Sequence, residues 1–247
     1  MSAQGNAGEG VEGTAGPGIV IAIDGPSGSG KSSTSKGVAR ARGLAYLDTG
    51  AMYRAITWWM LRNGIEAEDA VAVADAASKP VITMGTDPSA PTVQVDGTDV
   101  AGEIRTQEVT SSVSAVSAVP AVRERLVAMQ RDTIAQARRE SGGIVVEGRD
   151  ITTVVAPDAE VKIFLTASAE ARARRRSKEN SSDDVAGTQE ALARRDRLDS
   201  SRAVSPLTRT ADAVELETTG LGLQEVVDLV LGLADEAAAA EASPAAG

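Results

Sequence analysis

The chain has 247 residues, a formal net charge of −10 and 42% hydrophobic but only 2% aromatic residues. This size allows one large domain to bury a core without a metal or disulfide, and the negative charge disfavours binding to nucleic acid or to an acidic membrane. The sequence holds no Cys and no His, which excludes disulfides, thiolate nucleophiles, Ser-His-Asp triads and His-ligated metals.

The two ends of the sequence differ in composition from the rest. Residues 1–17 are rich in Gly, Ala, Ser, Glu and Thr, and we expect a disordered tail without the basic and apolar regions of a secretory signal. Residues 234–247 are Ala-rich and are expected to extend the last helix before fraying. No stretch reaches 18 apolar residues. A cytoplasmic location without membrane attachment is therefore expected.

Between these ends, short apolar runs alternate with helical patterns. The runs predict buried strands at residues 19–23, 144–146 and 161–165. Helices are predicted at residues 31–42, 51–63, 169–178, 189–197 and 222–233, the second one stopped by Gly64. Alternation of this kind indicates an α/β fold with a parallel sheet and right-handed crossovers.

One segment interrupts this alternation. Residues 81–84, 92–95 and 98–100 are short and β-prone, and Asp96-Gly97 suits a two-residue hairpin turn. We therefore expect a small antiparallel insert over about residues 65–105. Residues 180–188 are polar and predicted to be a mobile loop.

A phosphate-binding loop follows the first predicted strand. Its residues match G-x-x-x-x-G-K-[ST] and open a helix: Gly25, Pro26, Ser27, Gly28, Ser29, Gly30, Lys31 and Ser32, followed by Ser33. Such a loop points backbone N–H groups at phosphates, with Lys31 reaching the β- and γ-phosphates and the Ser32 hydroxyl reaching Mg²⁺. A bound nucleoside triphosphate is predicted.

The loop alone leaves several classes of protein open, including small-molecule kinases, GTP switches and other ATPases. No Asn-Lys-x-Asp guanine reader is present. Residues 99–102 and 184–187 match Asp-x-x-Gly, but two fixed positions are easily met by chance, and neither lies where a switch is expected.

Charged residues near the ends of predicted strands indicate where a phosphate acceptor would bind. Asp48 or Thr49 is expected to cap the second helix, with Arg54 one turn inside. Arg149 and Asp150 directly follow a buried strand, at the sheet edge where ligands collect. A guanidinium suits bidentate contact with phosphate. Either Glu147 or Asp150 is a candidate to support Mg²⁺, and spacing does not decide between them.

The segment 168–209 reverses the charge of the chain, with nine Arg and one Lys against seven Asp or Glu. It includes Arg172, Arg174, Arg175 and Arg176 before the polar loop and Arg194, Arg195, Arg197 and Arg202 after it. We interpret it as a lid that brings Arg side chains to transferring phosphates and excludes water.

A general base is not required, because a phosphate monoester with a second pKa of roughly 6 is already nucleophilic at pH 7. A phosphate acceptor is therefore favoured over an alcohol, although an Asp base acting on an alcohol stays open.

Together these motifs resemble the bacterial cytidylate kinases. The similarity is carried by residues 24–31, 48–54, 102–106, 122–124, 147–150, 161–165 and 195–207, in order along the chain. It implies a nucleoside monophosphate kinase fold: a phosphate-loop core (18–64 and 106–233), a nucleoside monophosphate-binding insert (about 65–105) and a helical lid (about 172–200).

The resemblance also implies a reaction: transfer of the ATP γ-phosphate, with Mg²⁺, to CMP or dCMP. It places Thr49, Arg54, Ser114, Arg123, Arg149, Asp150, Arg195, Asp199 and Arg202 around CMP. Arg54, Arg149, Arg195 and Arg202 would hold phosphate, and Ser114, Arg123 and Asp199 would bind cytosine or sugar. Because Ser111, Ser112 and Ser117 lie close to Ser114, the alignment there permits a shift.

In this interpretation Lys31, Arg149, Arg195 and Arg202 are the catalytic residues, and Arg172, Arg175 and Arg176 approach ATP. We expect a monomer acting on nucleotides alone. The alternatives are a kinase for UMP, AMP or a non-nucleotide acceptor, and a nucleotide-binding ATPase or switch.

Overall fold

The computed structural model describes residues 18–179 and 183–242, so the predicted tail at 1–17, part of the polar loop and the last five residues lie outside the described residues. Its centre is a parallel sheet in the order β2-β6-β1-β7-β8. The strands are β1 (Ile19–Asp24), β2 (Ala45–Asp48), β6 (Gly143–Gly148), β7 (Val161–Thr166) and β8 (Val214–Glu217).

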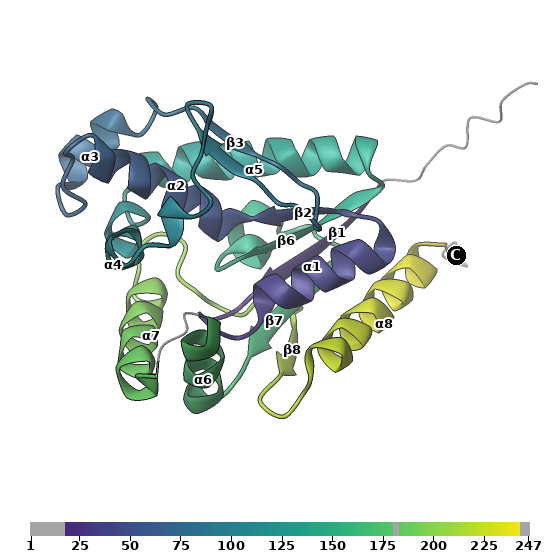
Figure 1. Ribbon diagram of the computed structural model, residues 1–247. Coiled ribbons are helices and arrows are strands. Elements are labelled where there is room, and N and C mark those ends of the chain that lie inside the picture. The colour runs from purple at the N-terminus through teal and green to yellow at the C-terminus, as the bar shows by residue number, and fades with distance from the viewer. Residues whose placement is uncertain (1–17, 180–182, 243–247) are drawn as a thin grey trace, which may run out of the picture.

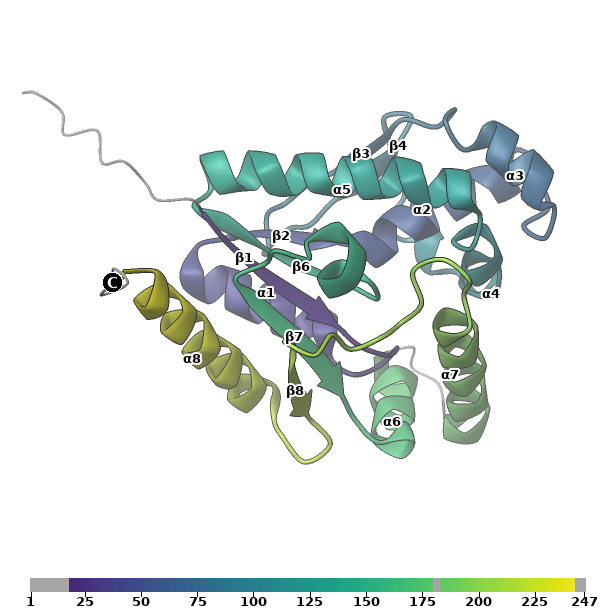
Figure 2. The same ribbon diagram turned by 180° about the vertical axis from the view of Figure 1, so that it is seen from behind.

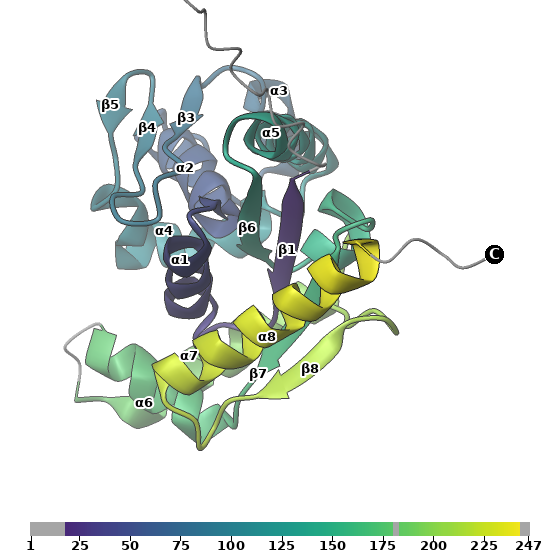
Figure 3. The ribbon, with the colours of Figure 1, turned by 90° about the vertical axis from the view of Figure 1, so that its right-hand side faces the viewer.

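Helices cover both faces of this sheet, which makes three layers (Figures 1 and 3). On one face, Ile21 and Ile23 of β1 pack into the core shared by α1 (Lys31–Arg42) and α8 (Leu223–Ala242). On the other face, Val20 and Ala22 pack into the core shared by α2 (Thr49–Arg62) and α5 (Pro120–Glu140). Burial on both faces explains why β1 is a continuous apolar run. The predicted α/β fold with a parallel sheet is confirmed.

The insert follows α2 and contains α3 (Ala70–Ala76), which the sequence reading did not predict, and the antiparallel strands β3 (Ile82–Met84), β4 (Val93–Val95) and β5 (Thr98–Asp99). Asp96 and Gly97 both have positive φ, 51° and 78°, as a type I′ hairpin turn requires. Asp96 also fixes the insert to α2, because its carboxylate accepts a hydrogen bond from Trp59 Nε1 at 2.9 Å. The predicted antiparallel strands are confirmed.

A 3₁₀ turn (Glu103–Arg105) and α4 (Gln107–Val116) lead from the insert to α5. A π-helical turn (Ile151–Val155) follows β6. The buried Asp24 carboxylate accepts hydrogen bonds from the backbone N–H groups of Ile151 and Thr152, at 3.0 and 2.8 Å. The end of β1 and the segment after β6 are therefore held together where the phosphate loop begins.

The segment predicted to be a lid contains α6 (Ala169–Glu179) and α7 (Val185–Ser200), which lie side by side at the end of the sheet where the strands terminate (Figures 1 and 2). The prediction of a loop over residues 180–188 is wrong for 185–188, which form the first turn of α7. Asp184 caps this turn by accepting a hydrogen bond from Gly187 N at 2.8 Å, so polar residues there start a helix. At the other end, α8 continues through Ala242 into the Ala-rich segment. No helix in the described ranges is long and apolar enough to cross a membrane.

Candidate active site

The phosphate loop joins β1 to α1 and uses glycine where other residues would be strained. Gly25, Gly28 and Gly30 have positive φ of 147°, 78° and 95°. A Cβ on Gly25 would lie 2.1 Å from the carbonyl oxygen of Leu165 in β7. The loop therefore packs directly against the neighbouring strand, at the N-terminus of α1, where backbone N–H groups favour anions.

Lys31, the first residue of α1, is buried beside the loop. Its Nζ donates a hydrogen bond to the carbonyl oxygen of Pro26 at 2.7 Å. Burial and then the positive charge of Arg149 lower the pKa of Lys31 to about 7, against the opposing effect of Glu147 and Asp24. A phosphate placed here would supply the negative charge that favours protonated Lys31.

Glu147 lies at the end of β6, next to Ser32. The Ser32 hydroxyl donates to Glu147 Oε2 at 2.9 Å, and the Tyr46 hydroxyl donates to Oε1. Burial and then Asp48 raise the pKa of Glu147 to about 7. Asp150, the other candidate to support Mg²⁺, is instead in a buried ion pair with Arg123. The geometry thus favours Glu147.

The oxygen atoms of Ser32 and Glu147 suit Mg²⁺ in the way that nucleotide-binding sites usually bind it. The described residues contain no cluster of three or more acidic side chains that could hold a metal alone. Mg²⁺ at such sites is usually bound through one or two protein oxygens, several waters and the phosphates of the substrate. The adjacent oxygens of Ser32 and Glu147 meet that description.

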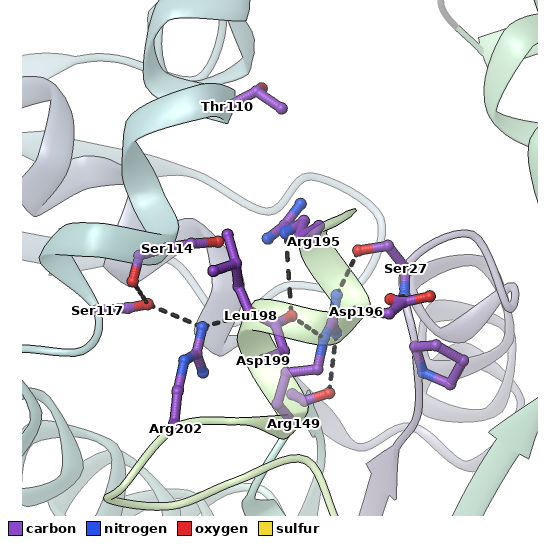
Figure 4. Close-up of polar contacts among 12 residues, drawn as sticks. Ser27, Thr110, Ser114, Ser117, Arg149, Arg195, Asp196, Leu198, Asp199 and Arg202 are labelled. Atoms are coloured by element: carbon purple, nitrogen blue, oxygen red, sulfur yellow. Dashed lines mark hydrogen bonds and ion pairs between the residues drawn. The ribbon is translucent and has the colours of Figure 1, made fainter. Parts of the chain in front are cut away.

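Asp199 organises the arginines on the opposite side of the cavity (Figure 4). Its side chain is 1% exposed and accepts hydrogen bonds from Arg149 Nε at 3.0 Å and Arg202 at 2.5 Å, while Arg195 Nε lies 4.0 Å away. Burial alone would raise the pKa of Asp199, but Arg149, Arg202 and Arg195 outweigh burial, so its pKa lies below 3.8. One carboxylate thus holds three guanidinium groups together.

The same cluster touches the phosphate loop. Arg149 donates to the Ser27 hydroxyl at 2.7 Å, and the backbone N–H of Ser27 donates to Asp196 of α7 at 3.2 Å. In Figure 4 the guanidinium group of Arg149 lies between Ser27 and Asp199. The loop that would bind the donor and the arginines that would bind the acceptor are in direct contact.

Residues of α2 form a third side. Asp48 caps the helix by accepting from Ala51 N at 3.0 Å, and Thr49 donates to the carbonyl oxygen of Glu147 at 2.7 Å. Arg54 is buried, donates to Ile104 O and Thr110 Oγ1, and has a pKa lowered to about 9, chiefly by burial and then by Arg195. An anion near Arg54 would offset this unfavourable environment.

Ser114, the serine predicted to bind the acceptor, does not line the cavity. It is buried in α4, whereas Ser117, one turn later, lines the cavity. The Ser117 hydroxyl accepts from Arg202 at 2.9 Å and donates to the carbonyl oxygen of Ser114 at 3.1 Å, and its own carbonyl oxygen accepts from Arg123 at 3.1 Å. Ser117 is one of the neighbouring serines that the sequence alignment left open.

The three arginines of α6 that were predicted to approach ATP differ in position. Arg172 donates to the carbonyl oxygen of Ser27 at 3.1 Å and pairs with Asp196. Arg175 donates to the Thr218 hydroxyl at 3.0 Å and lies 3.4 Å from the carbonyl oxygen of Ser29. Both therefore hold α6 against the phosphate loop. Arg176, which pairs with Glu179 at 3.0 Å, lines the cavity itself.

These parts surround one cavity of about 1030 Å³, its open mouth included. The residues proposed from the sequence that line it are Ser27, Gly28, Gly30, Lys31, Ser32, Ser33, Thr49, Arg54, Arg123, Glu147, Arg149, Asp150, Arg176, Arg195, Asp199 and Arg202. Gly25, Pro26, Ser29, Ser114, Arg172 and Arg175 lie outside its lining. Sequence reasoning missed Tyr53 and Arg105 as lining residues, although both belong to the motifs that carry the family resemblance.

Comparison with known proteins agrees with this architecture. The family model described as cytidylate kinase matches residues 21–236. The chain is 61% identical to a cytidylate kinase of Streptomyces avermitilis over 225 residues, covering 91% of this chain and 96% of that protein. It is 55% identical to a cytidylate kinase of Nocardia farcinica over 214 residues, covering 85% and 90%.

Among solved structures, an uncharacterized protein from Eubacterium ventriosum superposes with a TM-score of 0.51 at 11% identity, covering 88% of this chain and 98% of that one. At this identity the match supports the fold alone. The family match spans most of the chain and includes both the phosphate loop and the arginine cluster. The chain therefore belongs to the cytidylate kinase family.

Proposed function

We propose that the protein transfers the γ-phosphoryl group of ATP to CMP or dCMP, giving ADP and CDP or dCDP. The observation that carries this proposal is a single cavity with a phosphate loop on one side and Arg54, Arg149, Arg195 and Arg202 on the other. Membership of the cytidylate kinase family supports cytidine monophosphates as the acceptor.

The donor side consists of the phosphate loop and its lysine. Backbone N–H groups from Gly25 to Ser32 would bind the ATP phosphates, and Lys31 would move its ammonium from Pro26 O to the β- and γ-phosphates. Ser32 and Glu147 would hold Mg²⁺. When bound, the ion would supply positive charge that stabilises the ATP phosphates.

The acceptor side is built for a phosphate ester. Arg149 and Arg202 keep their orientation through Asp199 and retain further N–H donors for a ligand. Arg54 approaches from α2. In this proposal Arg123, Asp199 and a serine at the end of α4 contact cytosine or the sugar, and the geometry favours Ser117 over Ser114.

The chemistry then depends on positioning and charge rather than on a base. The acceptor phosphate is nucleophilic at neutral pH, and developing charge on the transferred group is stabilised by Lys31 and the arginines. Arg172 and Arg175 attach α6 to the loop, so a closed lid would exclude water that could otherwise hydrolyse ATP.

We further propose a monomeric cytoplasmic enzyme that acts on free nucleotides. The net charge of −10 is unfavourable for contact with nucleic acid or with an acidic membrane. The division into core, insert at about 65–105 and lid at about 172–200 belongs to the same proposal. In it the insert and the lid are the parts that close over the acceptor and the donor.

A direct test is to incubate the protein with Mg²⁺-ATP and, separately, with CMP, dCMP, UMP and AMP, and to identify the nucleotide products. CDP and dCDP are expected to dominate. Efficient formation of UDP or of ADP from AMP would support a kinase with another acceptor. Equal ATP consumption in all tubes without a diphosphate of the acceptor would indicate an ATPase.

A further inference from the structure

A buried tyrosine lies beside the phosphate loop, and the proposed transfer uses none of its atoms. Tyr46 is in β2, an edge strand of the sheet that pairs with β6 and places Tyr46 opposite Val145. Its ring packs in the core under α1. A hydroxyl in such a core needs a hydrogen-bond partner, and its partner here is the carboxylate of Glu147.

This contact is one of two that hold the Glu147 carboxylate in place. Tyr46 Oη donates to Oε1, and Ser32 Oγ donates to Oε2 at 2.9 Å. One donor comes from β2, the strand that pairs with β6, and the other from α1, which covers one face of the sheet. Because each oxygen has its own fixed donor, the carboxylate is held against rotation about its terminal bond, and Oε2 stays on Ser32.

The orientation of Glu147 determines the state of the Ser32 hydroxyl. A serine hydroxyl has one proton to donate and two lone pairs to accept. Because the proton is donated to Glu147, both lone pairs are left for another partner. A hydroxyl that binds a cation must present a lone pair to it, so a fixed acceptor for its proton prepares Ser32 for that role.

We propose that Tyr46 is a positioning residue for the divalent cation of the ATP complex. It acts through Glu147, which it orients so that Ser32 offers its oxygen to the ion. This inference rests on the proposed function, since it assumes a Mg²⁺-nucleotide in the cavity. Residues that orient metal ligands in this way typically change metal affinity or activity by about 10–100-fold when removed.

The test is Tyr46→Phe, which removes only the hydroxyl, with Thr57→Val as a matched control. Thr57 is also buried, and its hydroxyl bonds the carbonyl oxygen of Tyr53 within α2. Mn²⁺ is titrated into the complex of each protein with ADP, and free Mn²⁺ is measured by electron paramagnetic resonance. Tyr46→Phe is expected to weaken Mn²⁺ binding by about 10-fold, while Thr57→Val does not change it.

Kinetics provide the second readout. The Mg²⁺ concentration for half-maximal rate should rise by about the same factor in Tyr46→Phe, with kcat at saturating Mg²⁺ and KM for CMP close to wild type. A folded Tyr46→Phe protein with wild-type Mn²⁺ affinity would overturn the proposal, whereas absence of CDP from the wild-type reaction would instead overturn the proposed function.

Glu147→Gln keeps the proposal testable if Tyr46→Phe does not fold. It retains the size of the side chain but replaces one carboxylate oxygen by an amide donor. This variant should lose at least as much Mn²⁺ affinity, because it alters the group through which Tyr46 acts. Where Tyr46→Phe does fold, the double variant should lose little more, because both changes act on one interaction. Wild-type Mn²⁺ affinity in Glu147→Gln would show that Tyr46 has no ligand to orient.

Discussion

Replacing Asp199 by Ala removes the one carboxylate that holds three arginines of the acceptor side together. Asp199 is 1% exposed and accepts hydrogen bonds from Arg149 and Arg202, with Arg195 at 4.0 Å. The variant leaves these guanidinium groups close together without their counter-charge. Mutual repulsion should then spread them and spoil the geometry of the acceptor phosphate site.

The expected magnitude follows from these contacts. Removing one partner of a buried ion pair costs about 3–5 kcal/mol of folding free energy. For a domain of this size that lowers the melting temperature by roughly 6–20 °C. A hydrogen bond to a charged group is worth about 1.5–3 kcal/mol, so loss of oriented arginines should lower kcat/KM for CMP by about 10- to 150-fold.

The assay is steady-state kinetics with each nucleotide varied in turn, at a temperature at which the variant is folded. KM for ATP should change less than about 3-fold, since Asp199 does not contact the phosphate loop directly. Asp132→Ala, which removes an exposed carboxylate of α5, is the control for the change in net charge. Equal losses for ATP and CMP, or wild-type kinetics for CMP in the folded variant, would refute the reasoning.

Three further changes test other parts of the structure. Lys31→Ala should reduce kcat by at least about 100-fold, because it removes a donor aimed at the transferred phosphate; near-normal turnover in a product assay would contradict the assigned role. Gly25→Ala should destabilise the fold by about 3 kcal/mol or more, because its Cβ would lie 2.1 Å from Leu165 O at a φ of 147°. Urea unfolding measures this effect, and Gly102→Ala, which has open space around it, should be nearly neutral. The arginines hold the pKa of Asp199 in the folded protein below the ordinary aspartate value. The ionised Asp199 therefore contributes its full stabilisation above the pKa of the unfolded chain, and this stabilisation is lost as the pH falls from there through the folded-state pKa. The stability difference between wild type and Asp199→Asn should therefore shrink on going from pH 6 to pH 3, and a constant difference would argue against the ionised Asp199.

The parts of the molecule that the sequence predicted are those specified by local signals. The phosphate loop is a contiguous pattern between a strand and a helix, and Gly25, Gly28 and Gly30 all adopt the positive φ that glycine favours. The hairpin of the insert is equally local, because Asp96 and Gly97 are residues that adopt positive φ readily. The alternation of these segments was sufficient to predict a parallel sheet with helices on both faces.

The elements that sequence reasoning missed depend on distant partners. The helix α5 carries many charged residues, yet it lies against the sheet, with Arg123 buried because Asp150 of a segment 27 residues away pairs with it. The strand β8 is only four residues long and is largely exposed at the sheet edge. Its place is set by pairing with β7, which the local sequence does not reveal.

The site shows the same limit more sharply, because its members act through one another. Ser27 occupies a variable position of the phosphate-loop pattern, yet its hydroxyl accepts from Arg149, which binds Asp199, which in turn binds Arg202. These four residues span more than 170 positions of the sequence and connect the donor side of the cavity to the acceptor side. A motif identifies each residue type separately, whereas the charge state and orientation of each depend on the next in the network. For that reason the sequence was able to name most residues of the cavity but did not identify Asp199 as the group that holds three of its arginines in place.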